Sequence, residues 1–136
     1  MILEIGQYGW AKIYIGDNGS IFTGKASYLR DTPMEILEAF KLYIDKNIIP
    51  TIKCDEEGSE FIIVVDEYTT HIISERNIIQ HFSWDISCKD FILQTIDDIE
   101  HQLDNAISFM CDEDDENKQE TMLFLIQYIK ENLNEK

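Results

Sequence analysis

The spacing of the apolar residues differs between segments of the chain, and this difference constrains the fold more than any other feature. Phe61-Ile62-Ile63-Val64-Val65 is a short apolar run without alternation, which is typical of a central strand covered on both faces. Further on, apolar residues recur every three or four positions, as on one face of a helix: Ile92, Ile96, Ile99, Leu103 and Ile107. Strand patterns dominate roughly the first 80 residues and helix patterns the remainder, so the sequence predicts an α+β fold.

Two turn-forming segments in the first half predict hairpins. Gly16 to Ser20 tolerate the positive φ of a tight turn, and the acidic segment 55–58 ends in glycine. The expected strands are 10–15 with 21–23, 51–54 with 61–65, and a further strand at 71–74. If the second hairpin closes, the segments 55–58 and 66–70 lie at opposite ends of the sheet, because consecutive turns of an antiparallel sheet alternate between its ends.

Capping residues place the helices. Thr32, followed by proline, can cap a helix that should end near Asn47. Ser87 can cap a long helix, and Asn117 can cap the last one. A short link between these last two helices predicts that they pack as an antiparallel hairpin. We therefore expect one domain over residues 1–136, with one mainly antiparallel sheet of about five or six strands, one helix after the first hairpin and a C-terminal antiparallel helix pair.

The chain is strongly acidic, with 27 acidic and 11 basic residues and a formal net charge of −16. This charge repels nucleic acid and anionic membrane surfaces, and it attracts basic proteins. The excess is uneven, because residues 97–136 carry 12 acidic and 3 basic residues, a net of −9. The alternative reading is that the charge serves only solubility.

Cys54, Cys88 and Cys111 are odd in number and show no paired spacing, which favours free thiols in a reducing compartment. The start of the chain has no basic residue and no long apolar run, so no signal peptide is expected. No stretch approaches the roughly 18 consecutive apolar residues of a membrane span. These features predict a cytoplasmic protein.

Sequence signatures of catalysis and metal binding are missing. There is no phosphate-binding glycine loop, no G-x-S-x-G elbow, no C-x-x-C pair and no H-E-x-x-H motif, and the run from Asp112 to Glu116 lacks the glycine of an EF-hand. We therefore expect no enzyme activity, no cofactor and no metal. A catalytic site of dispersed carboxylates or thiols remains the alternative.

Three features can instead carry binding to a basic partner. They are an acidic block with the acids before it, two acidic turns, and aromatic residues of the kind enriched at interface hot spots. The alternatives are a solvated helix linker, ordinary polar turns and core aromatics. The predicted partner-binding residues are Asp97, Asp98, Glu100, Asp104, Asp112, Glu113, Asp114, Asp115, Glu116, Glu56, Glu57, Asp66, Glu67, Tyr68 and Trp84.

Three segments carry a resemblance to a known class of proteins: Gly9-Trp10, Tyr28 to Pro33 before the first helix, and Glu57 to Phe61 before the apolar strand. Together with the acidity, they resemble the small acidic immunity proteins of bacterial contact-dependent inhibition and other polymorphic toxin systems. The resemblance implies a cytoplasmic protein that binds and neutralises one cognate toxin domain, often a basic nuclease. Another acidic interaction protein, such as a homo-oligomeric adaptor or a nucleic-acid mimic, is the alternative, and a homodimer stays open.

Overall fold

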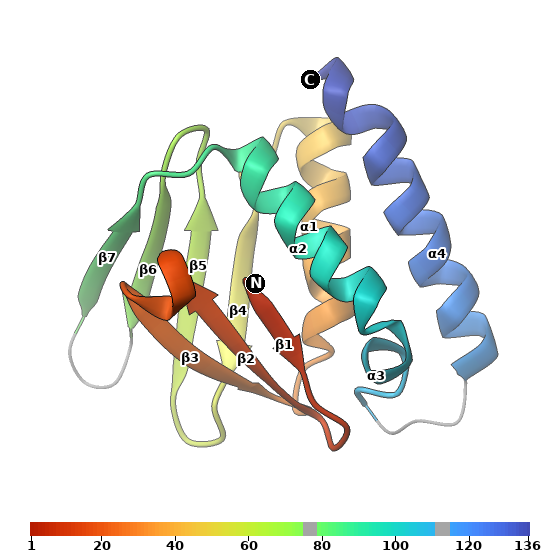
Figure 1. The fold of residues 1–136 in the computed structure, drawn as a ribbon, viewed down its shortest axis with the longest axis horizontal. Helices are drawn as coiled ribbons and strands as arrows, with labels where there is room; N and C mark the ends of the chain where they lie inside the picture. The colour runs from red at the N-terminus through yellow and green to blue at the C-terminus, as the bar shows by residue number, and fades with distance from the viewer. Residues whose placement is uncertain (75–78, 111–114) are drawn as a thin grey trace.

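The fold is α+β but contains two antiparallel sheets, so the expectation of a single sheet was wrong. A computed structural model describes residues 1–74, 79–110 and 115–136 (Figure 1). One sheet has the order β1-β2-β3 and the other the order β4-β5-β6-β7. The strands are β1 (Leu3–Ile5), β2 (Trp10–Ile15), β3 (Phe22–Ser27), β4 (Thr51–Asp55), β5 (Glu60–Val65), β6 (Thr70–Ser74) and β7 (Gln80–Trp84).

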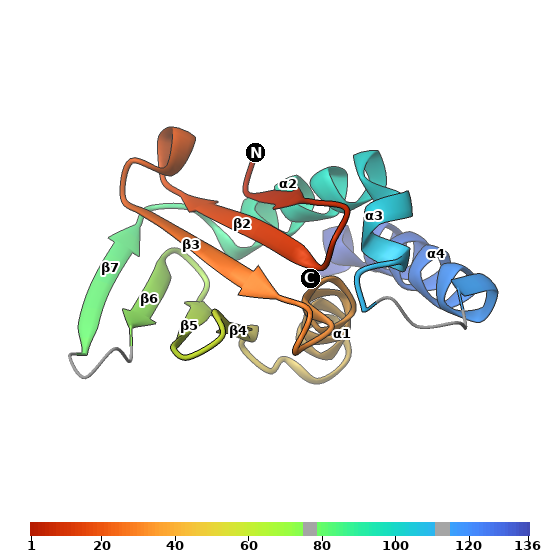
Figure 2. The same cartoon turned by 90° about the horizontal axis from the view of Figure 1, so that it is seen from below.

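The two sheets pack face to face instead of pairing edge to edge (Figure 2). The ring of Phe22 on β3 lies 5.0 Å from that of Phe61 and 5.6 Å from that of Phe82, both in the second sheet. Gly24 allows this approach, because a Cβ there would lie 2.6 Å from the Phe61 ring. The first hairpin therefore buries its apolar face against the second sheet. In the expected arrangement, its strands would have belonged to the same sheet.

β5 is a central strand, as expected, but its two faces differ. It pairs with β4 on one side and β6 on the other. Phe61, Ile63 and Val65 are buried, whereas Ile62 and Val64 are half-buried. Burial thus alternates along this apolar strand, and only the face of β5 toward the first sheet is fully covered.

The first helix begins and ends close to the expected residues. α1 (Thr32–Lys46) is capped by Asp31, whose Oδ1 accepts a hydrogen bond from the Met34 amide at 3.5 Å. The expected cap, Thr32, is instead the first helical residue. Asn47 ends the helix in the left-handed conformation, at φ 58°.

The C-terminal helices form a layer with α1, so the expected helix pair was incomplete. The expected long helix is divided at Gln102 (φ −124°), and Asn117 lies inside the last helix instead of capping it, whereas Ser87 caps α2 as expected. α4 lies along α1 through a hydrogen bond from Tyr128 to Asp45, and it also contacts α2 (Figure 1). The remaining elements are α2 (Cys88–His101), α3 (Leu103–Ile107), α4 (Asp115–Asn132) and the short 3₁₀ helices η1 (Asp17–Gly19) and η2 (Leu133–Glu135).

Buried apolar residues from both sheets and the helix layer form one hydrophobic cluster. Its largest members include Phe40 of α1, Phe61 of β5 and Phe91 of α2. None of the helices in the described part of the chain is long and apolar enough to cross a lipid bilayer.

Candidate partner-binding surface

Apart from the acidic block 112–116, the predicted partner-binding residues in the described part of the chain lie in three separate regions. Glu56 and Glu57 lie in the β4–β5 turn, and Asp66, Glu67 and Tyr68 lie in the β5–β6 turn. The strand register places these turns at opposite ends of the sheet, which confirms that expectation. The acids of α2 and α3 form the third region, in the helix layer. The residues predicted from the sequence to bind a partner therefore belong to more than one surface.

Trp84 belongs to the same end of the sheet as the β5–β6 turn. It pairs with Thr70, the first residue of β6, and is half-buried. The two ends of this sheet therefore differ: one carries Asp66, Glu67, Tyr68 and Trp84, and the other carries Glu56 and Glu57.

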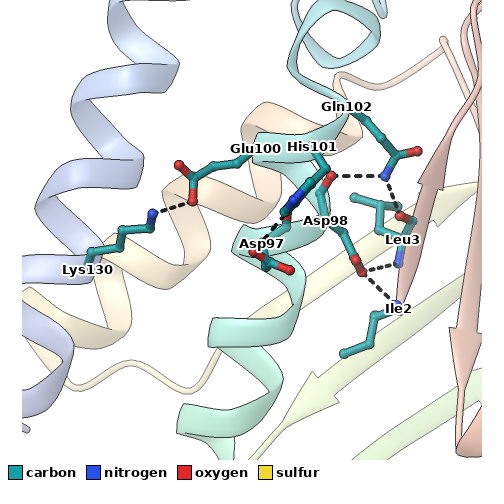
Figure 3. A network of polar contacts seen from close by, with 8 residues as sticks. All are labelled: Ile2, Leu3, Asp97, Asp98, Glu100, His101, Gln102 and Lys130. Atoms are coloured by element: carbon teal, nitrogen blue, oxygen red, sulfur yellow. Dashed lines mark hydrogen bonds and ion pairs between the residues drawn. The ribbon is translucent and has the colours of Figure 1, made fainter.

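Asp98 makes intramolecular contacts (Figure 3). Its Oδ2 accepts hydrogen bonds from the amides of Ile2 at 2.7 Å and Leu3 at 3.0 Å. Gln102 accepts from the Ile5 amide at 2.7 Å and donates to the Leu3 carbonyl at 2.8 Å. These side chains satisfy the free edge of β1, so the Asp98 carboxylate already serves the fold.

The neighbouring acids of α2 are partly neutralised. Glu100 forms an ion pair with Lys130 of α4 (Figure 3). His101 Nδ1 lies 2.7 Å from the Asp97 carbonyl and 3.5 Å from its carboxylate. The hydrogen bond to that carbonyl raises the pKa of His101, and the nearby carboxylates of Asp97, Glu100 and Asp98 raise it further. Asp97, Glu100 and Asp104 are exposed, and the Asp97 side chain is 69% open to solvent.

The acidic block is only partly described. Asp112, Glu113 and Asp114 lie outside the described residues, and for Asp115 only the backbone position, at the start of α4, is given. Glu116 is exposed on the first turn of α4. The role predicted for this block therefore stays a prediction.

A hollow of about 710 Å³ lies at the end of the sheet that carries the β5–β6 turn. Tyr68 is the most exposed of the large apolar and aromatic side chains there, with 72% of its surface open to solvent. Three parts of the chain meet at the hollow: the turn after β5, the end of α1 and the last residue of the chain. The lining residues are Tyr43, Asn47, Ile49, Val65, Asp66, Glu67, Tyr68, Thr69 and Lys136.

Asp66 is held in a defined position in its turn. Its Oδ1 accepts hydrogen bonds from the amides of Tyr68 at 3.2 Å and Thr69 at 2.8 Å, and its Oδ2 lies 3.0 Å from His71 Nε2. The hydrogen bond with His71, followed by those from the backbone, lowers the pKa of Asp66. Its carboxylate is therefore charged under physiological conditions.

The rest of the turn is anchored by the start of α2. The carbonyl of Glu67 accepts a hydrogen bond from the Cys88 amide at 3.0 Å, and the Glu67 side chain is exposed.

Burial raises the pKa of the Cys88 thiol to about 11, and burial also raises the pKa of the Cys54 thiol. These two thiols are therefore poor nucleophiles, and the hollow offers carboxylates and aromatic rings as its binding groups.

A smaller hollow, of about 270 Å³, adjoins the first through Lys136. Tyr128 and Asp45, which line it, are joined by a hydrogen bond. Hydrogen bonds from Lys41 and Tyr128 lower the pKa of Asp45. We call the two hollows together the tyrosine–carboxylate surface, defined by Tyr43, Asp45, Asp66, Glu67, Tyr68, Tyr128, Glu135 and Lys136.

One cation already binds an aromatic ring of this surface. Lys136 Nζ lies 4.7 Å from the centroid of the Tyr43 ring, within the range of a cation–π interaction. Carboxylates beside tyrosine rings are well suited to the ammonium and guanidinium groups of a protein partner. In the described residues, no group of three or more His, Cys, Asp or Glu side chains is placed to hold a metal ion.

The sequence prediction included Asp66, Glu67 and Tyr68 but not the residues that the helices contribute to this surface. Tyr43 reads as a member of an apolar helix face, and Asp45 and Tyr128 lie 83 residues apart. No local spacing links two residues so distant, so the sequence held no signal for their contact.

Comparison with models of protein families, with curated proteins and with solved structures found no match to this chain.

Proposed function

We propose that this protein is an immunity-type inhibitor, which binds the basic face of a cognate toxin domain through the tyrosine–carboxylate surface and catalyses no reaction. The observation that carries the proposal is the hollow at the β5–β6 turn, where exposed Tyr68 stands beside Asp66 and Glu67. Tyrosines and charged groups in a concave site are typical of the residues that dominate binding energy. The proposed compartment is the cytoplasm, where Cys54 and Cys88 would stay reduced.

The net charge supports a basic partner. A charge of −16 attracts a positively charged protein over long distances and raises the association rate, at low salt up to about 10⁸–10⁹ M⁻¹s⁻¹. Steering of this kind acts through the whole acidic surface, whereas the stability of the complex comes from a few well-packed contacts. Acids that lie far from the contact, such as Asp104, would then affect the association rate more than the dissociation rate.

Three observations favour the tyrosine–carboxylate surface over the acids of α2. Asp98 is occupied by the amides of β1, and Glu100 is paired with Lys130. The Asp66 carboxylate also accepts hydrogen bonds, but these come from its own turn and from His71 and fix it beside a hollow. A group that is already ordered loses less entropy when a partner binds.

The test is co-expression with the product of the gene immediately upstream, followed by purification of the complex and measurement of Kd. Tyr68→Ala should weaken binding by about thirtyfold, the effect of about 2 kcal/mol at a hot spot. Glu67→Gln should slow association, with a smaller effect at high salt. Glu57→Gln, at the opposite end of the sheet, and Asp17→Asn are matched controls that should leave Kd within about twofold, the range of near-neutral contacts.

The outcomes separate the function from the surface. Failure of the two proteins to co-purify, or failure of this protein to protect cells that produce the upstream product, would contradict the proposed function. A complex that tolerates Tyr68→Ala but is weakened by Glu57→Gln would keep the function and place the interface at the β4–β5 turn.

A further inference from the structure

The outer face of the first sheet carries a basic hollow on this otherwise acidic protein. The hollow has a volume of about 370 Å³ and lies on the face opposite to the buried residues Ile13 and Ala26. Figure 2 shows that this face of β2 and β3 is turned away from the second sheet. The lining residues are Glu4, Gly6, Trp10, Ala11, Lys12 and Lys25.

Two lysines face each other in this hollow without a counter-charge between them. Lys12 of β2 is the direct cross-strand partner of Lys25 of β3. On its other side, Lys12 is also the cross-strand partner of Glu4 of β1. Like charges in directly opposed positions destabilise a sheet. In the described part of the chain neither lysine forms an ion pair, whereas several other lysines do: Lys41, Lys53, Lys118 and Lys130. The pair therefore leaves two ammonium groups available to an anion from solution.

An aromatic ring lies beside these charges. Trp10 precedes Lys12 by two positions on the same strand, so both side chains point to the same face, and Trp10 is 37% exposed. Indole rings provide a flat surface on which planar ligands stack. The volume of the hollow lies in the range of small-molecule sites, about 300–1,000 Å³.

We propose that this hollow binds a nucleoside monophosphate. The phosphate would accept hydrogen bonds from Lys12 and Lys25, the base would stack on Trp10, and the Glu4 carboxylate would accept a hydrogen bond from a ribose hydroxyl. Each lining side chain with a functional group then has a role. The proposal is independent of the toxin-binding function, because the tyrosine–carboxylate surface shares no residue with this hollow.

Charge favours a mononucleotide over a nucleic acid strand. A strand would extend beyond the two lysines and meet the surrounding acids of a protein with a net charge of −16. A single phosphate stays within the patch, where screening over about 8 Å at physiological salt limits repulsion from distant carboxylates.

The test uses the intrinsic fluorescence of Trp10. Trp84→Phe leaves Trp10 as the only tryptophan in the chain. Titration with adenosine monophosphate should quench this fluorescence in a saturable way, with a Kd below about 1 mM. Adenosine and inorganic phosphate should each bind at least about tenfold more weakly, because each keeps only part of the contacts. Lys12→Gln with Lys25→Gln should weaken binding by about tenfold or more, whereas Lys46→Gln, an exposed lysine on α1, should not.

The unmutated protein provides a second measurement. In an NMR titration with adenosine monophosphate, the indole N–H resonance of Trp10 should shift and that of Trp84 should not. The proposal is overturned if adenosine monophosphate produces no saturable change, if Lys46→Gln weakens binding as much as the Lys12/Lys25 variant, or if an oligothymidylate binds more tightly than the mononucleotide.

Discussion

The carboxylate of Asp98 takes the place of a neighbouring strand at the edge of β1. It accepts hydrogen bonds from two consecutive amides, those of Ile2 and Leu3. Gln102 and Asn105 complete the edge, with Asn105 donating to the Ile5 carbonyl at 2.9 Å. Exposed strand edges tend to pair with other chains, and covering them with side chains removes that possibility.

Replacing Asp98 should therefore destabilise the protein. We expect Asp98→Ala to lower the free energy of unfolding by about 2–3 kcal/mol, because two partly buried amides lose a charged acceptor. Asp98→Asn keeps one acceptor oxygen and should cost about 1 kcal/mol. Urea denaturation measures both losses, and hydrogen exchange of the Leu3 amide should accelerate in the alanine variant.

Asp97→Ala is the matched control, because Asp97 lies one residue away with an exposed side chain. It should change stability by less than about 0.5 kcal/mol. Equal effects of Asp97→Ala and Asp98→Ala would contradict the role of Asp98 at the strand edge. If Asp98→Asn weakened the complex with a partner but left the stability unchanged, Asp98 would be part of the binding interface, as predicted from the sequence.

At the scale of elements, one ion pair ties the start of α4 to the start of α1. Lys118 Nζ lies 2.7 Å from Asp31 Oδ2, and the Lys118 side chain is only 9% exposed. Asp31 also caps α1, so the same residue fixes a helix end and the packing of two helices. The Lys130–Glu100 pair between α4 and α2 is a natural comparison, because its lysine is 43% exposed.

We expect these two pairs to differ in their contribution to stability. Lys118→Met should lower the free energy of unfolding by about 1–2 kcal/mol, since it removes the partner of a partly buried carboxylate. Lys130→Met should cost less than about 1 kcal/mol, as for an exposed pair. Denaturation of both variants in the same buffer measures their free energies of unfolding. A larger loss of stability for Lys130→Met than for Lys118→Met would contradict the argument from burial.

Two helix ends that depend on adjacent residues were predicted correctly from the sequence, whereas the caps expected at Thr32 and Asn117 were wrong. Ser87 caps α2 through the Asp90 amide at 3.1 Å, and α1 ends at Asn47, both as expected. The break at Gln102 was not predictable, because its side chain bonds to β1, almost 100 residues away. The division into two sheets depends likewise on packing between Phe22 and Phe61, which no local pattern contains.

The candidate surface shows the same distinction at the scale of the whole molecule. Asp66, Glu67 and Tyr68 are adjacent in one turn, so their composition alone drew attention to them. Tyr43 and Tyr128 join them only because α1, α4 and the second sheet end at one side of the molecule (Figure 1). A sequence can therefore predict the turn residues of such a surface. The residues that the helices contribute to it can be identified only from the three-dimensional structure.

The net charge also predicts how the stability of the whole molecule depends on pH. At −16 the folded chain repels itself, and compact states lose stability from such repulsion. The pKa of His101 is raised in the folded state, so its contribution is fully present below its unfolded pKa and is lost as pH rises through the folded value. The pKa values of Asp45 and Asp66 are lowered, so their contributions are present above the unfolded pKa and lost as pH falls through the folded values.

These effects together place the maximum of stability on the acidic side of neutrality. At low ionic strength we expect the Tm at about pH 5.5 to exceed that at about pH 8 by roughly 3–5 °C, which for a domain of this length corresponds to about 1 kcal/mol. About 0.5 M NaCl should raise the Tm at pH 8 and shrink the difference, because it screens the self-repulsion. His101→Gln should remove only the part of the difference that comes from titration near neutrality. A Tm that is higher at pH 8, or a difference that salt does not reduce, would show that the acidic groups are too far apart to repel one another in the folded protein.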